Sequence, residues 1–142
     1  MKRISSKATI YLIDGSNFSR SLCDRHQGGK PDALETEFLN WLDDVSRLET
    51  FSASSFRVVF DGGFRPVCGL ANPSINVYFS GHEAADDFLL ERSYFLGEEG
   101  VRCVIVTNDR EIREKAAGEK VMSMPCDAFY RLCDSELKKK NR

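Results

Sequence analysis

The sequence lacks any long hydrophobic run, and this absence limits where the chain can reside. No stretch of about 18 consecutive apolar residues occurs among its 142 positions, so no transmembrane helix is predicted. The first residues, MKRISSKATIYLID, also lack the apolar core and cleavage site that are typical of a signal peptide. We therefore expect a protein that does not enter a membrane and resides in the cytoplasm.

Cysteine and histidine are too few and too scattered to predict a zinc cage. Zinc sites draw their ligands from closely spaced Cys and His residues. Here the five cysteines form no CxxC pair, and the chain has only two histidines. These residues are Cys23, Cys68, Cys103, Cys126, Cys133, His26 and His82. Reduced thiols of a cytoplasmic protein are the favoured interpretation.

A basic excess is also missing, since 20 Lys and Arg stand against 22 Asp and Glu, for a formal net charge of -2. Dedicated nucleic-acid binders usually carry a basic excess, so the total charge gives no support for that class. It does not exclude an enzyme that acts on nucleic acid, because an acidic metal site offsets local basic patches. Apolar residues make up 42%, which together with the length predicts one globular domain over 1–142, with a short basic tail from about residue 138.

Short apolar runs alternate with amphipathic segments along the chain. The runs that read as strands are 9–13, 56–60, 75–79, 101–107 and, more weakly, 119–124. The intervening segments predict helices because apolar residues recur every three or four positions, as in 33–51 and in the C-terminal segment 126–139. A helix beginning near residue 83 would place on one face Ala85, Phe88, Leu89, Arg92 and Leu96. Strands alternating with helices predict a parallel sheet covered on both faces.

An acidic residue follows three of these predicted strands directly. Asp14 lies in LIDGSN, Asp61 in VVFDGG and Asp109 in VIVTNDRE. Ligands of parallel sheets bind beyond the carboxyl ends of the strands, so these carboxylates are expected at one edge. Like charges there raise one another's pKa unless a cation compensates. Hard cations such as Mg2+ prefer oxygen ligands, polarise phosphodiesters and lower the pKa of bound water, so the pattern predicts metal-assisted phosphoryl chemistry.

Each acid also has a purely structural interpretation. Asp14 fits a turn or a cap of the helix that follows it, and Asp61 fits a turn before two glycines. Asp109 fits a cap of the next helix. Asp86 and Asp87 open a helix, where acids are favourable near the positive end of the dipole in any protein. The joint pattern is more specific than any single member.

Four segments, LIDGSN, VVFDGG, EAADDFLLE and VIVTNDRE, resemble in this order the PIN-like nucleases, and most closely their NYN branch, which includes the bacterial YacP-like ribonucleases. The resemblance runs from about Thr9 to Phe129. It implies a three-layer α/β/α sandwich of the PIN-like, Rossmannoid type, with a central parallel sheet of about five strands. It also implies a Mg2+- or Mn2+-dependent endoribonuclease that hydrolyses phosphodiester bonds of single-stranded RNA with a metal-activated water.

The same resemblance assigns roles to individual residues. The expected catalytic residues are Asp14, Asn17, Asp86 and Asp109. The expected metal ligands are Asp14, Asp86 and Asp109, together with Asp61 and Asp87. Asn17 would hold Asp14 or a metal-bound water, and Asp87 replaces Asp86 if the register is displaced by one. Arg113 stands where some relatives carry a further acid.

Basic and aromatic residues near the expected cleft are candidates for binding RNA, because Arg matches phosphate through its planar fork of donors. The candidates are Arg20, Arg65, Arg110 and Arg113, together with Asn108. Lys115 fits equally well a solvated helix face paired with Glu111. Phe64 and Phe18 are candidates for stacking on bases, although Phe18 fits the core better.

Other functions stay open on the sequence alone. A non-catalytic RNA- or protein-binding module would keep the same fold. A DNA-directed nuclease would share the metal chemistry, but the chain has little room for the helices that thread DNA. An aspartate-nucleophile phosphatase is disfavoured, because Gly63 stands where its second Asp would be. Guidance by a ribosome or by a protein partner is neither predicted nor excluded.

Overall fold

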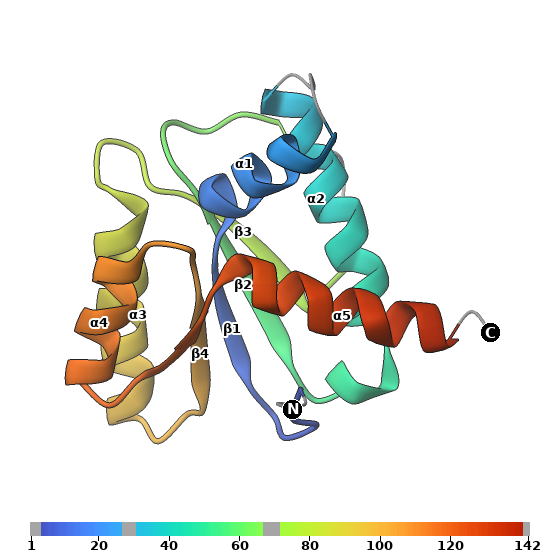
Figure 1. Ribbon diagram of the computed structural model, residues 1–142. Helices are drawn as coiled ribbons and strands as arrows, with labels where there is room; N and C mark the ends of the chain where they lie inside the picture. Colours follow the sequence, from blue (N-terminus) through green and yellow to red (C-terminus); the bar gives the residue numbers. More distant parts are fainter. Residues whose placement is uncertain (1–3, 27–30, 67–71, 141–142) are drawn as a thin grey trace.

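Five parallel strands form the central sheet, in the order β3-β2-β1-β4-β5 (Figure 1). The computed structural model describes residues 4–26, 31–66 and 72–140, and the side chains of 22–26 and 31–33 are not described. The strands are β1 Ile10–Asp14, β2 Ser55–Phe60, β3 Ile75–Phe79, β4 Cys103–Val106 and β5 Met122–Met124. β1 is central, with Tyr11 opposite Phe56 on one side and Val104 on the other. The predicted parallel sheet of about five strands is confirmed.

Helices cover both faces of this sheet, so the predicted three-layer α/β/α sandwich is also confirmed (Figure 1). The helices are α1 Gly15–His26, α2 Pro31–Ser46, α3 Ala85–Glu98, α4 Arg110–Gly118 and α5 Cys126–Lys140, with a 3-10 turn η1 at Glu49–Phe51. α1, α2 and α5 pack on one face, and α3 and α4 pack on the other. In the part of the chain that the structure describes, no helix is both long and apolar enough to cross a membrane.

The face under α1, α2 and α5 is an aromatic core. Phe18 of α1 contacts Phe38 of α2 with ring centroids 4.6 Å apart, and Tyr11 of β1 stacks on Phe56 of β2 at 5.4 Å. Phe129 of α5 packs against the same cluster. All five side chains are buried, so Phe18 is a core residue and is not available to stack on a base.

The face under α3 and α4 is aliphatic, and here one sequence-based expectation is wrong. α3 buries Ser93 in place of Arg92. The Ser93 hydroxyl donates to the carbonyl of Leu90 at 2.7 Å, which satisfies it in the apolar layer. Arg92 is exposed and its guanidinium lies 5.0 Å from the centre of the Phe88 ring, where the charge stays in water.

One helix ends earlier than the periodicity predicts, and the expected basic tail overlaps the end of another helix. The apolar spacing over 33–51 predicts one helix, but α2 ends at Ser46 and a separate turn, η1, follows. The chain tightens there through short-range bonds, such as that from the Leu48 amide to the Val45 carbonyl. The basic stretch expected as a tail from about 138 begins as the last turn of α5, which runs to Lys140. Basic residues are favourable at that end of a helix dipole.

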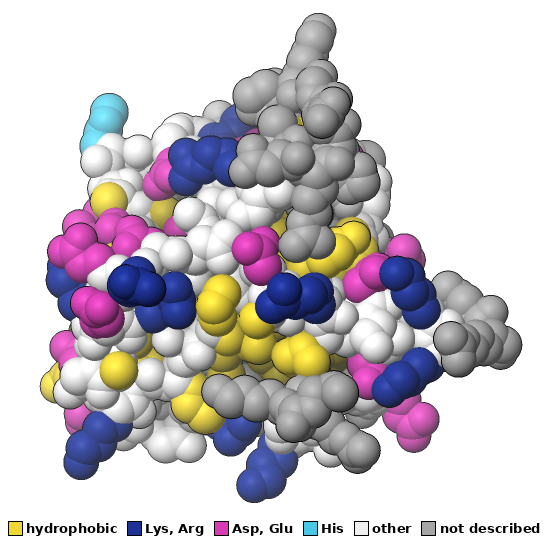
Figure 2. Space-filling view, in the orientation of Figure 1, with side chains coloured by type: hydrophobic (Ala, Val, Ile, Leu, Met, Phe, Trp, Pro, Cys, Tyr) yellow, Lys and Arg dark blue, Asp and Glu magenta, His cyan; other side chains and the backbone are white. Residues whose placement is uncertain are grey.

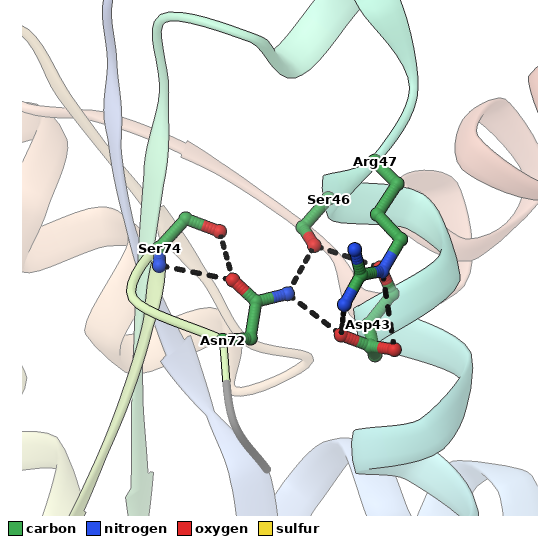
Figure 3. Close-up of polar contacts among 5 residues, drawn as sticks. All are labelled: Asp43, Ser46, Arg47, Asn72 and Ser74. Carbon is green, nitrogen blue, oxygen red and sulfur yellow. Dashed lines mark hydrogen bonds and ion pairs between the residues drawn. The ribbon is translucent and has the colours of Figure 1, made fainter.

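A polar network joins the end of α2 to the start of β3 (Figure 3). The Asn72 amide donates to the Asp43 carboxylate at 2.7 Å and to the Ser46 hydroxyl at 2.8 Å. Its carbonyl oxygen accepts from the amide and the hydroxyl of Ser74. The hydrogen bond from Asn72 lowers the pKa of Asp43, and Arg47 lowers it further. This network holds the amino edge of the sheet, opposite to the ends where the acids lie.

Candidate active site

A pocket of about 230 Å³ lies at the carboxyl edge of the sheet, where the strand order reverses. The chain leaves β1 through α1 on one face and leaves β4 through α4 on the other, which is where open α/β sheets bind ligands. The residues that line the pocket are Asp14, Asn17, Arg20, Asp61, Ala84, Ala85, Asp86 and Asp109. The structure thus brings four of the predicted acids together, while what they bind stays a prediction.

Asp14 ends β1 and is only 8% exposed. One carboxylate oxygen accepts from the Asn17 backbone amide at 3.1 Å, which caps α1, and the other accepts from the Thr107 hydroxyl at 3.2 Å. Burial raises the pKa of Asp14, and the nearby carboxylate of Asp61 raises it further, although both hydrogen bonds lower it. A carboxylate in this position is costly to ionise, so a bound cation would stabilise it.

The close approach of two β2 side chains to residue 15 explains why a glycine follows Asp14. A Cβ at this position would lie 2.6 Å from Cε1 of Phe60 and 2.7 Å from Cγ1 of Val58, and both of those side chains are fully buried. α1 therefore begins in direct contact with β2. The Ser16 hydroxyl accepts from the Asp61 amide at 2.8 Å, which ties α1 to the loop after β2.

Thr107 follows β4 directly and contacts both Asp14 of β1 and Asp109. Its buried hydroxyl donates to Asp14 and accepts from the backbone amide of Asp109 at 3.2 Å. The Asp109 carboxylate accepts from the amides of Glu111 and Ile112 at 2.9 and 3.4 Å, so it caps α4. The structural interpretation of Asp109 is therefore correct, and the cap also fixes its place at the pocket.

Asp61 and Asp86 border the pocket at the start of α3. The residue before that helix, Ala84, has no polar side chain, and the carboxylate of Asp61 accepts from the Ala85 amide at 3.1 Å instead. Asp86 lines the pocket and also accepts from the amide of Asp87 at 2.9 Å. Asp87 is exposed and is not among the lining residues, so the geometry favours Asp86.

Two asparagines hold the surrounding segments together. The side-chain oxygen of Asn17 accepts from the Asn108 amide at 2.9 Å and from the Cys126 thiol at 3.5 Å. Burial raises the pKa of Cys126, which keeps that thiol protonated. The side chain of Asn108 donates to Ser21 and accepts from the Cys126 amide, each at 2.8 Å. The structure gives Asn108 a joining role between α1 and α5, and its contact with substrate stays a prediction.

The basic candidates divide between the pocket and its surroundings. Arg20 is exposed, lines the pocket and lowers the pKa of Asp14. Arg110 and Arg113 lie on α4 and are not among the lining residues. Lys115 pairs with Glu111 at 3.4 Å, which fits its interpretation as part of a solvated helix face. On the face drawn in Figure 2, basic and acidic side chains are interspersed.

Arg65 is held in place by its own contacts. Its guanidinium forms a two-pronged pair with Glu35 of α2, with Nε 2.9 Å from the carboxylate, and donates to the carbonyls of Asp61 and Gly63 at 3.0 and 2.9 Å. Sequence reasoning missed this pair. The available signal was an acid on the apolar face of α2, since Glu35 is only 8% exposed. The prediction that Arg65 binds substrate stays untested, and its contacts favour a structural role.

The donor set suits a hard divalent cation only in part. Within residues 4–26, 31–66 and 72–140, no three Asp, Glu, His or Cys side chains converge closely enough to hold one ion together. In the same residues, Asp61, Asp86 and Asp109 each use one carboxylate oxygen in a backbone hydrogen bond and keep the second without one. Mg2+ is commonly bound by one or two carboxylates plus water and substrate phosphate. The pocket fits that mode of binding and does not fit an all-protein cage.

Comparison with known proteins finds a likeness among solved structures. No family model and no curated protein sequence matches this chain. The fold is similar to the crystal structure of Rae1 (YacP) from Bacillus subtilis, with a TM-score of 0.72 and 16% identity, over 94% of this chain and 78% of that one. A point mutant of the same protein matches with a TM-score of 0.73 and 15% identity, over 92% and 78%. The expected likeness to YacP is confirmed at the level of the fold.

Proposed function

We propose that this chain is a Mg2+- or Mn2+-dependent endoribonuclease that hydrolyses phosphodiester bonds of single-stranded RNA. One observation carries the proposal: four carboxylates share one pocket at the switch point of a fold similar to that of Rae1 (YacP). The sequence segments that resemble YacP-like ribonucleases are the ones that supply these carboxylates.

Asp14 and Asp86 are the residues proposed to hold the ion, with Asp61 and Asp109 beside them. When bound, the ion supplies positive charge for the phosphate and lowers the pKa of a water molecule near it. The protein's own part is positioning. Asn17 and Thr107 fix the Asp14 carboxylate from two sides. Arg20, which reaches the pocket from α1, would bind a phosphate of the RNA backbone.

The charges of the pocket support this assignment. Burial and a neighbouring carboxylate both raise the pKa of Asp14. Arg20 is the only Lys or Arg among the lining residues, so the four acidic side chains of the pocket outnumber the basic ones. A polyanionic substrate would be repelled by such a pocket. A divalent cation held by Asp14 and Asp86 would offset this repulsion.

A non-catalytic RNA- or protein-binding module on the same fold is the second candidate, and one observation favours it. Asp61 and Asp109 have clear structural duties as caps of α3 and α4, and no three acids converge within the described part of the chain. In that case the pocket would hold no ion and the protein would bind without cutting.

The test is cleavage of an end-labelled single-stranded RNA with Mg2+, with Mn2+ and with EDTA. Asp14→Asn removes the proposed ligand, and Asp44→Asn is the matched control, because Asp44 is an exposed acid near the far end of α2. We expect metal-dependent cleavage by the wild type and by Asp44→Asn, and a loss of at least about 100-fold in Asp14→Asn.

Other results would overturn the proposal. RNA binding without cleavage in any metal would favour the binding module. Cleavage retained in Asp14→Asn would remove the pocket from the mechanism. A single-stranded DNA of the same sequence is the comparison substrate, and a preference for it would replace RNA by DNA as the substrate.

A further inference from the structure

Phe64 presents its aromatic ring to solvent on the loop that begins at Asp61, one of the residues lining the acid pocket. It is 84% exposed, the highest value among the large hydrophobic side chains of the described residues. The ring meets Phe79 at a steep angle, 76° between planes, with centroids 5.5 Å apart. Most of its surface is therefore open. Single exposed apolar residues are common, so this exposure gains meaning only from the structure that supports it.

The loop around Phe64 is fastened on both sides. Arg65 donates to the carbonyls of Asp61 and Gly63, which precede Phe64, and is itself paired with the buried carboxylate of Glu35. The Arg65 guanidinium also lies 5.0 Å from the centre of the Phe79 ring, against which Phe64 packs. Water can satisfy the backbone hydrogen-bonding groups of a surface loop, so the buried ion pair of Arg65 is not needed for that purpose. The effect of these contacts is to fix the segment that carries Phe64.

A second contact anchors the start of the same loop. Gly62 has a φ of +90°, which favours glycine, and its carbonyl accepts from the Gly81 amide at 2.8 Å. This bond joins the loop after β2 to the segment before α3, which also borders the pocket. The ring is thus held on a supported loop, as a preorganised binding surface requires.

The position of Phe64 relative to the acids is limited by the chain itself. Asp61 lines the pocket and lies three residues earlier, so the two Cα atoms are at most about 11 Å apart. The intervening residues carry no charge, and the charge of Arg65 is balanced by Glu35. The loop therefore offers an uncharged aromatic surface next to a polar pocket. Unpaired nucleobases stack on such surfaces in proteins that bind single strands.

We propose that Phe64 is a stacking platform for an unpaired nucleobase adjacent to the acid pocket. This inference rests on the proposed function and specifies it. A strand with one phosphate at the acids would place a nearby base on the ring. Paired bases in a duplex have both faces covered by their neighbours, so the platform selects single-stranded RNA.

The first test is binding of a fluorescently labelled, unpaired RNA of about ten nucleotides, measured by anisotropy in EDTA and again in Ca2+, with a gel of each sample to show that the RNA stays intact. Phe64→Ala should weaken binding roughly 5- to 100-fold, the range expected for loss of one stacked base. Tyr94→Ala is the matched control, because Tyr94 is a half-exposed aromatic residue of α3, and it should bind as the wild type does. A duplex of the same sequence should show no dependence on Phe64.

The second test reads stacking directly. Phe64→Trp should bind the RNA at least as tightly as the wild type, and the RNA should quench its tryptophan fluorescence. The wild type, whose only tryptophan is Trp41, supplies the background. No added quenching in Phe64→Trp, or equal affinity of Phe64→Ala and the wild type for the single strand, would overturn the platform, and the ring would then be assigned to another contact, such as an apolar side chain of a protein.

These outcomes are separate from those of the nuclease test. Binding that depends on Phe64 without cleavage in any metal would support the platform and overturn the nuclease. Cleavage that proceeds equally well in Phe64→Ala, with unchanged RNA affinity, would support the nuclease and overturn the platform. A wild-type protein that neither binds nor cleaves single-stranded RNA when Mg2+ or Mn2+ is present would overturn both.

Discussion

The hydroxyl of Thr107, just after β4, donates to the carboxylate of Asp14 at the end of the neighbouring strand β1, at 3.2 Å. The same oxygen accepts from the amide of Asp109, so one buried hydroxyl sets the positions of two acids from neighbouring strands. The pocket is therefore sensitive to residues that do not line it.

Thr107→Val should separate the role of the hydroxyl in positioning the acids from the role of the side chain's volume. It keeps the volume of the side chain but leaves the Asp109 amide without its acceptor and Asp14 without one donor. We expect a cost of about 1–3 kcal/mol in the free energy of unfolding, measured with urea, and a fall in cleavage of about tenfold or more. Thr107→Ser retains the hydroxyl and should keep most of the activity. Equal activity in the Val and Ser variants would contradict the positioning role.

Asp14→Asn should change how stability depends on pH. Because the pKa of Asp14 in the folded protein lies above its ordinary value of 3.8, the folded state binds more protons than the unfolded state between those two values. The wild type should therefore lose stability as the pH rises through that window. The Asp14→Asn side chain does not ionise, so the variant should not lose stability in this way.

The measurement is thermal unfolding of both proteins in EDTA from about pH 3 to pH 7, where the advantage of Asp14→Asn should grow with pH. Added Mg2+ or Mn2+ should then stabilise the wild type and leave the variant unchanged. An advantage that is constant across pH would show that ionisation of Asp14 is not the cause.

Asn72→Ala tests the lowered pKa of Asp43, a shift opposite in direction to that of Asp14. The Asn72 amide lowers the pKa of Asp43, so the interaction stabilises the fold above the unfolded pKa of about 3.8 and is lost as the pH falls through the lower folded value. We expect the variant to lose about 1–2 kcal/mol at neutral pH and less in acid. Asn76→Ala, on the exposed side of β3, is the control for urea unfolding at both pH values. A loss that does not diminish in acid would point to packing rather than charge.

Gly15→Ala tests the close approach of α1 to β2. Alanine favours a helix by up to about 1 kcal/mol, but the added methyl would overlap two fully buried side chains, which costs about 1–3 kcal/mol. We expect a net loss of stability and weaker cleavage as Asp14 shifts. Gly97→Ala is the matched control, since a Cβ there meets no atom within 4 Å, and it should stabilise the protein. Destabilisation of equal size in both variants would refute the steric explanation.

The gathering of the acids could be predicted because it depends on topology alone. Parallel strands end at one edge, so Asp14 and Asp109, each just after an apolar run, were expected at the same edge, and the pairing of β1 with β4 makes them neighbours there. The identity of the helix-borne acid could not be settled in this way. It depends on where α3 begins, and the cap from Asp61, 24 residues earlier, sets that start.

Contacts between distant segments were beyond the reach of sequence patterns. Glu35 and Arg65 are 30 residues apart, and neither has a periodicity that names its partner. The bond between Asn17 and the Asn108 amide spans 91 residues. Such pairs follow from the packing of complete elements. Local spacing shows only that a polar residue stands in an apolar position.

The acids of the pocket receive hydrogen bonds from the first turns of three helices. Asp14 accepts at the start of α1, Asp61 at the start of α3 and Asp109 at the start of α4. The positive ends of three dipoles offset part of the repulsion among the carboxylates before any ion arrives. The protein's own backbone therefore positions these three carboxylates. If the proposed chemistry holds, a cell could keep this protein folded and idle, and its activity would follow the concentration of divalent ions.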